Sequence, residues 1–69
     1  MNFKDWLIEY KDIDRPIGDL AKEVGQDGTF PNSSDYEALI DYFDSRNAQQ
    51  AVLDTFEYVY RFYKDDTKP

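Results

Sequence analysis

An all-α fold, a compact bundle of four helices with a long C-terminal helix, is what this sequence predicts. Apolar side chains recur four times at positions i, i+3, i+4 and i+7, the spacing that gathers them on one side of an α-helix. The 69-residue chain has no cysteine and no histidine, so neither disulfide bonds nor the usual zinc ligands supplement its core. The four apolar sets are Phe3/Trp6/Leu7/Tyr10, Ile17/Leu20/Ala21/Val24, Tyr36/Leu39/Ile40/Phe43 and Phe56/Val59/Tyr60/Tyr63.

Capping residues place the first two helices. The first is expected over residues 3–10, with Asn2 as its N-cap. The second begins at Pro16, whose missing N–H costs nothing in a first turn. Its last apolar residue is Val24, and Gly25 is expected to end it in a left-handed C-cap.

A polar loop over residues 25–33 separates the second helix from the third. Its one large ring, Phe30, is expected to insert into the core and to fix the path of the loop. The third helix should open with a capping box formed by Ser34 and Glu37, and should end near Asp44.

The fourth helix has a weaker start signal at residues 47–50 and should continue to about Lys64. Residues 1–64 then form a single helical domain. Residues 65–69 are expected to be a frayed C-terminal tail.

The fourth helix also carries a second apolar stripe on nearly the opposite side. A helix with two apolar sides is either packed on both or keeps one for a partner. We favour packing on both sides, while the alternative makes Tyr58 and Phe62 the best contact surface. The second stripe consists of Ala51, Thr55, Tyr58 and Phe62.

The net charge of −7 lies entirely in the middle of the chain. Residues 12–44 hold nine acids against two bases, a difference of seven, and the segments on either side are neutral. This pattern is typical of a solvated surface that keeps a small protein soluble. It also suits a docking face for a basic partner, of which Asp41 and Asp44 are the candidate contacts.

Several function classes are disfavoured by composition. Serine hydroxyls have no histidine to activate them, no glycine-rich phosphate loop is present, and we expect neither catalysis, metal nor cofactor. Nucleic-acid binding works against the excess of acids. No segment approaches the roughly 18 consecutive apolar residues of a membrane span, and we expect a cytoplasmic protein without membrane contact.

Motifs along most of the chain resemble those of the YozE family, short bacterial proteins found mainly in Firmicutes and their phages. The most specific is the Asp-x-x-Phe-Pro segment before the third helix. The resemblance implies a sterile-alpha-motif-like helical fold and no established activity, so that any function taken from the fold is analogy. The matching motifs are Phe3-x-x-Trp6-Leu7-x-x-Tyr10, Pro16-Ile17-x-x-Leu20-Ala21, Asp27-x-x-Phe30-Pro31 and Phe56-x-x-x-Tyr60-x-x-Tyr63.

These observations favour a small acidic interaction module. It binds either a different protein or a second copy of the same chain. The alternative is a nucleic-acid-binding module, and a third hypothesis is an acidic face that imitates nucleic acid. The identity of the partner and the oligomeric state do not follow from the sequence. The residues expected to contact the partner are Thr55, Tyr58, Phe62, Asp41 and Asp44.

Overall fold

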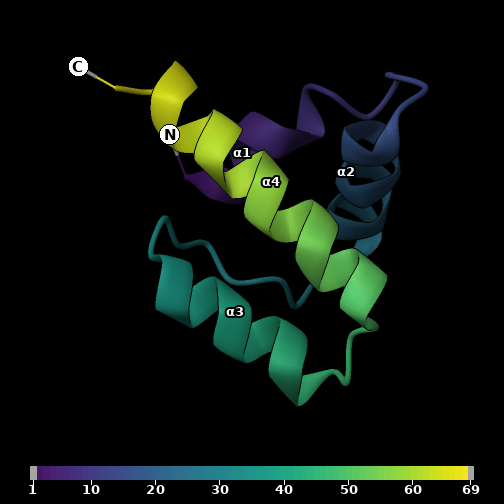
Figure 1. Ribbon diagram of the computed structural model, residues 1–69, viewed down its shortest axis with the longest axis vertical. Coiled ribbons are helices and arrows are strands. Elements are labelled where there is room, and N and C mark those ends of the chain that lie inside the picture. Colours follow the sequence, from purple (N-terminus) through teal and green to yellow (C-terminus); the bar gives the residue numbers. More distant parts are fainter. Residues whose placement is uncertain (1, 69) are drawn as a thin grey trace.

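The computed structural model describes residues 2–68, and within that range it contains four α-helices and no strand. The predicted all-α fold class is confirmed. Figure 1 shows α4 running diagonally across the molecule, with α1 and α2 on one side of it and α3 on the other. The helices are α1 (Phe3–Ile8), α2 (Pro16–Gln26), α3 (Tyr36–Ser45) and α4 (Gln50–Asp66).

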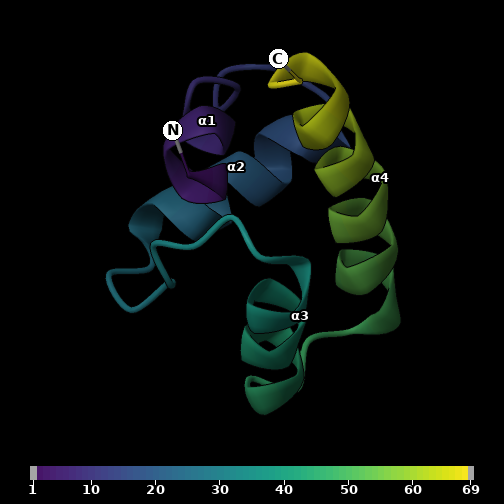
Figure 2. The same ribbon diagram turned by 90° about the vertical axis from the view of Figure 1, so that its left-hand side faces the viewer.

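The longest helix, α4, is also the central one. It contacts each of the other three helices, whereas the only helix that α3 contacts is α4. The loop between α2 and α3 therefore carries the chain from one side of α4 to the other (Figure 2). In this arrangement α4 buries Phe56, Val59 and Tyr63 against its neighbours.

The core is built from the predicted apolar sets. Within residues 2–68, every buried apolar side chain except Phe30 belongs to one of the four sets, and Phe30 is itself buried as expected from the loop. Phe3 and Phe56 are fully buried, and their rings meet edge to face at 5.4 Å between centroids. Aromatic pairs in this geometry contribute about 0.5–1.5 kcal/mol beyond the area they bury.

Some predicted caps are confirmed and others are wrong. The Asn2 side chain accepts a hydrogen bond from the backbone N–H of Asp5 and caps α1, but α1 ends at Ile8 instead of residue 10. Pro16 opens α2 as expected. Gly25, however, lies inside α2, which continues to Gln26, and no glycine of the chain has a positive φ.

The predicted capping box of α3 is also wrong. Asp35 is the N-cap, and its carboxylate accepts from the backbone N–H of Ala38 at 3.1 Å. Ser34 is used by α4 instead, because its hydroxyl accepts from Tyr63 at 2.9 Å and its carbonyl accepts from Tyr60 at 2.7 Å. Two tyrosines of α4 thus fix the entry into α3, which the sequence spacing of Ser34 and Glu37 did not reveal.

The ends of α4 differ from expectation as well. Asn47 has a left-handed φ of 55°, which turns the chain before α4 begins at Gln50. The helix continues to Asp66, beyond the predicted start of a frayed tail, and the indole N–H of Trp6 donates to the Asp66 carboxylate at 2.8 Å. Residues 1 and 69, which the predicted domain and tail include, lie outside the described residues.

Candidate interaction groove

Large apolar side chains exposed to solvent are the first sign of a site. Among residues 2–68 there are three, and two of them, Tyr58 at 73% and Phe62 at 42% exposure, lie on α4. The third is Ile13, in the connection between α1 and α2. We call the side of α4 formed by residues 51, 55, 58 and 62 its outer face, and the buried side formed by residues 56, 59 and 63 its inner face. Packing on both sides, the favoured interpretation of the sequence, is wrong for Tyr58.

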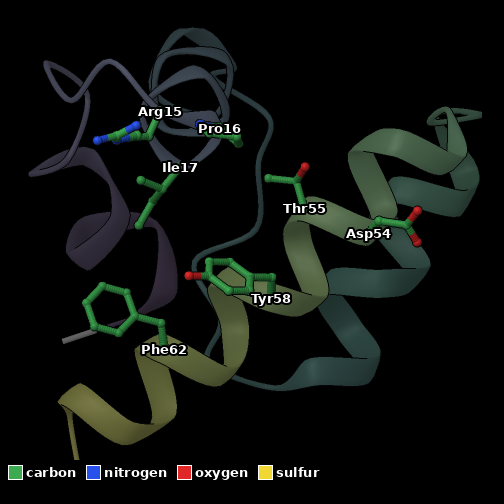
Figure 3. A pocket seen from close by; sticks show the side chains of 7 residues that line it. All are labelled: Arg15, Pro16, Ile17, Asp54, Thr55, Tyr58 and Phe62. Carbon is green, nitrogen blue, oxygen red and sulfur yellow. The ribbon is translucent and has the colours of Figure 1, made fainter.

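A groove of about 550 Å³ lies between the outer face of α4 and the start of α2. Figure 3 shows Ile17 descending from α2 toward Tyr58 and Phe62, with Thr55 further along the same side of α4. The groove is mostly apolar, and one charged side chain of each sign lines it. The lining residues are Arg15, Pro16, Ile17, Asp54, Thr55, Tyr58 and Phe62.

The wall of the groove on the α2 side depends on a close approach at Gly18. A Cβ atom added to this buried glycine would lie 1.7 Å from the carbonyl oxygen of Ile13. The connection between α1 and α2 therefore folds back against the first turn of α2, and the backbone N–H of Arg15 donates to the same carbonyl at 2.9 Å. Only glycine allows this contact, which holds Arg15 and Pro16 beside α4.

The two rings of the outer face differ in how far they belong to the core. The Phe62 ring meets Trp6 at 5.4 Å and Tyr10 at 5.9 Å between centroids, so it covers the end of α1. Tyr58 makes no ring contact and no hydrogen bond with any residue in the described range 2–68. The hydroxyl of Thr55 donates to the Ala51 carbonyl at 2.9 Å, so it needs no partner outside α4.

Not all of the predicted contact residues come together. Thr55, Tyr58 and Phe62 line the groove, but Asp41 and Asp44 are exposed on α3 and do not line it. The structure thus separates the aromatic part of the predicted contact surface from this pair of acids.

Sequence reasoning missed the opposite wall of the groove. Ile17 belongs to the second apolar set and was assigned to the core, but it is only half-buried and lines the groove with Arg15 and Pro16. Being the first member of its set gave no reliable signal, because Phe3 and Phe56 hold the same place in their sets and are fully buried. Tertiary packing decides which helix lies opposite the first turn of α2, and spacing along the sequence does not show it.

A second cluster of polar groups surrounds Asp27, the acid of the Asp-x-x-Phe-Pro segment. Its carboxylate accepts hydrogen bonds from the Tyr42 hydroxyl and from the backbone N–H and hydroxyl of Thr29, and Arg46 lies 3.8 Å away. The Tyr42 hydrogen bond, followed by those of Thr29, lowers the pKa of Asp27 to about 2. A carboxylate so fully paired is a structural anchor, and it holds Phe30 against α3.

Two other kinds of feature, a metal centre and a membrane-spanning helix, are missing from the described residues. Between residues 2 and 68, no group of three or more acidic, histidine or cysteine side chains is arranged to hold a metal ion. Across the same span, none of the helices combines the length and apolar character needed to cross a bilayer.

Comparison with known proteins identifies one family. The family model described as "YozE SAM-like fold" matches residues 2–65, nearly the whole chain. Comparisons with curated proteins and with solved structures gave no match. The family match agrees with the four-helix architecture and carries no statement of activity.

Proposed function

We propose that this chain, which belongs to the YozE SAM-like family, is a non-catalytic module that binds another protein through the groove beside α4. The observation that carries the proposal is Tyr58, a large ring that is 73% exposed above an apolar groove. Tyrosine is one of the residues that most often dominate binding energy at protein interfaces. The contact is proposed to centre on Tyr58, Phe62 and Thr55.

The surroundings of Tyr58 support a role in binding rather than in the core. Removing Tyr58 would take no ring contact away from the core, because it has none within residues 2–68. A partner that covers it would bury roughly 150–250 Å² of ring surface, which the folded chain alone leaves in water. The Tyr58 ring therefore has more apolar surface to bury against a partner than it buries on folding.

Site-specific photo-crosslinking tests the proposal in the cells from which the chain comes. A photoreactive phenylalanine replaces Tyr58 in one variant and Asp41 in another. Asp41 is exposed on α3 and does not line the groove, so it is a matched surface control. We expect a discrete crosslinked protein from position 58 and none from position 41.

Two outcomes of the same experiment would contradict the proposal. Equal labelling of the same protein from both positions would place the contact elsewhere or make it non-specific. No adduct from position 58 in a variant that melts like the parent chain would remove the groove as a binding surface.

A second candidate, nucleic-acid binding, rests on one basic cluster near the end of α4. Arg61, Lys64 and Lys68 line a shallow hollow there, but Asp65 lies in the same hollow and pairs with Lys68 at 3.7 Å. Since affinity for phosphates comes largely from releasing counterions, a net charge of −7 works against it. Titration with single-stranded and duplex DNA at low salt is expected to show no binding, and binding that Lys64→Ala weakens would favour this candidate instead.

A further inference from the structure

The groove continues along α4 into a second hollow. This hollow, of about 200 Å³, shares Pro16 and Thr55 with the first and is otherwise lined by the next turns of α2 and the start of α4. We call the two hollows together the furrow. On α4 it extends from Ala51 to Phe62, which corresponds to about 16 Å of helix at 1.5 Å per residue.

The borders of the furrow are mainly acidic. Asp19 and Glu23 line it on the α2 side and Asp54 lines it on the α4 side, whereas Arg15 is the one base among its lining residues. All four side chains are exposed, and none forms a salt bridge within residues 2–68. Asp54 accepts a hydrogen bond from the side-chain amide of Gln50 at 2.9 Å, a neutral donor that leaves its charge in place. Three carboxylates without a salt bridge, on both sides of an apolar floor, are complementary to a positively charged partner.

The furrow also restricts the backbone conformation that a partner can adopt when it binds. Its floor is made by side chains such as Leu20 and Val52, and the helices that form it use their own backbone groups internally. A partner backbone pressed against such a floor must satisfy its own N–H and C=O groups, because a buried polar group without a hydrogen bond is strongly unfavourable. An α-helix does this and an extended peptide does not.

We propose that the furrow binds an amphipathic α-helix of a partner protein, with Lys and Arg bordering its apolar stripe. This inference rests on the proposed function and adds the chemistry of the partner. Three turns of helix match the length of the furrow, with apolar side chains between Ile17 and Tyr58 and basic ones opposite Asp19, Glu23 and Asp54. A second copy of the chain is a poorer occupant, because each copy brings a charge of −7.

The test uses three synthetic 14-residue peptides and the full chain. The first has leucine at helical spacing and lysine elsewhere, the second has the same composition in scrambled order, and the third has glutamate in place of lysine. None contains tryptophan, so the fluorescence of Trp6, whose ring lies 5.4 Å from that of Phe62, reports binding. We expect the amphipathic Leu/Lys peptide to bind about tenfold or more tighter than either control.

Two triple variants separate the furrow from overall charge. Asp19→Asn, Glu23→Gln and Asp54→Asn neutralise the furrow borders. Glu37→Gln, Asp41→Asn and Asp44→Asn neutralise the same number of acids on α3, and each set includes one acid from the first turn of a helix. We expect the first triple variant to weaken Leu/Lys binding by about tenfold and the second by less than about threefold, since only close charges resist screening.

Each other outcome overturns the inference. Equal losses in the two triple variants would mean attraction by net charge alone, and equal binding of the Leu/Glu peptide would remove the charge argument. Sedimentation showing a dimer that Tyr58→Ala dissociates would make a second copy the occupant. If position 58 crosslinks a protein in cells but the Leu/Lys peptide shows no preference, the inference fails while the proposed function stands.

Discussion

The two faces of α4 have the same helical spacing of apolar residues but opposite fates. On the inner face, Phe56 and Val59 are fully buried and Tyr63 is 3% exposed. On the outer face, Tyr58 is 73% exposed and Ala51 is exposed as well. Periodicity alone therefore identifies a side that can be buried, and it does not say whether the chain itself buries it.

The reason for the difference is the number of helices available. The rings that surround Phe56 come from α1, α3 and α4 itself, through Phe3, Phe43 and Tyr60. Trp6 of α1 and Tyr10, just after this helix, pack on the outer face at Phe62. Over residues 2–68 the structure has no further helix that covers Tyr58. In such a small domain, the uncovered side of the central helix is therefore the apolar surface available for binding a partner.

The largest expected effect is on the inner face. Phe56→Ala should lower the free energy of unfolding by about 3–5 kcal/mol, because it empties a fully buried ring position. Domains have only about 0.05–0.15 kcal/mol of stability per residue, so this loss should remove a large part of the stability of the chain. Circular dichroism during urea titration measures this. A stable Phe56→Ala variant would mean that the inner face does not hold the fold together.

The next effect concerns the wall of the groove. Gly18→Ala should destabilise by about 1–3 kcal/mol, because its Cβ atom would meet the Ile13 carbonyl oxygen at 1.7 Å. Gly25→Ala in the same helix is the control, since its nearest neighbour would be Ile8 Cγ1 at 3.7 Å, and it should stabilise by about 0.4–1 kcal/mol. Urea unfolding compares the two. A Gly18→Ala variant as stable as the parent chain would show that the connection does not press against α2 at Gly18.

A smaller effect is expected at Asp27, whose carboxylate is held by several hydrogen bonds, in contrast to the acids of the furrow, which form no salt bridge within residues 2–68. Its folded pKa of about 2 lies below the unfolded value of about 3.9 for aspartate. The folded state thus favours the ionised form, so this stabilisation is complete above pH 4 and is lost as the pH falls through the folded pKa. Melting temperatures between pH 5 and pH 2.5 should therefore fall less steeply in Asp27→Asn than in the parent chain.

The control for this measurement is Asp41→Asn, an exposed acid without a hydrogen-bond partner in the described residues. Its melting temperature should follow the parent chain over the same range of pH. An Asp27→Asn curve parallel to that of the parent would show that Tyr42 and Thr29 do not hold the carboxylate.

These contrasts also show how much of the fold and of the groove can be predicted from the sequence. The four helices and nearly all core residues follow from helical spacing, because a buried stripe needs that spacing whatever lies opposite. The caps at Gly25 and Ser34 were predicted wrongly, since Gly25 continues α2 and Ser34 is bonded by Tyr60 and Tyr63 from another helix. Half of the groove was predicted, through Thr55, Tyr58 and Phe62, and its α2 wall was missed because tertiary packing alone brings Ile17 there.

The smallest effect on stability is expected at Tyr58. Tyr58→Ala should change the free energy of unfolding by less than about 0.5 kcal/mol, because the ring is mostly in water and alanine favours helix. Arg61→Ala, at an exposed polar position of the same helix, is the matched control in urea unfolding. A loss of more than about 2 kcal/mol in Tyr58→Ala alone would assign this ring to the core.

Fluorine NMR of the chain labelled with 3-fluorotyrosine compares the two faces of α4 in one sample. Tyr58 and Tyr63 lie on opposite faces, and replacing each with phenylalanine assigns its signal. We predict that the Tyr58 signal lies close to that of free fluorotyrosine and moves when the Leu/Lys peptide is added, whereas the Tyr63 signal stays in place. A Tyr58 signal that is displaced in the free chain and indifferent to the peptide would contradict the claim that the outer face of α4 is kept for a partner.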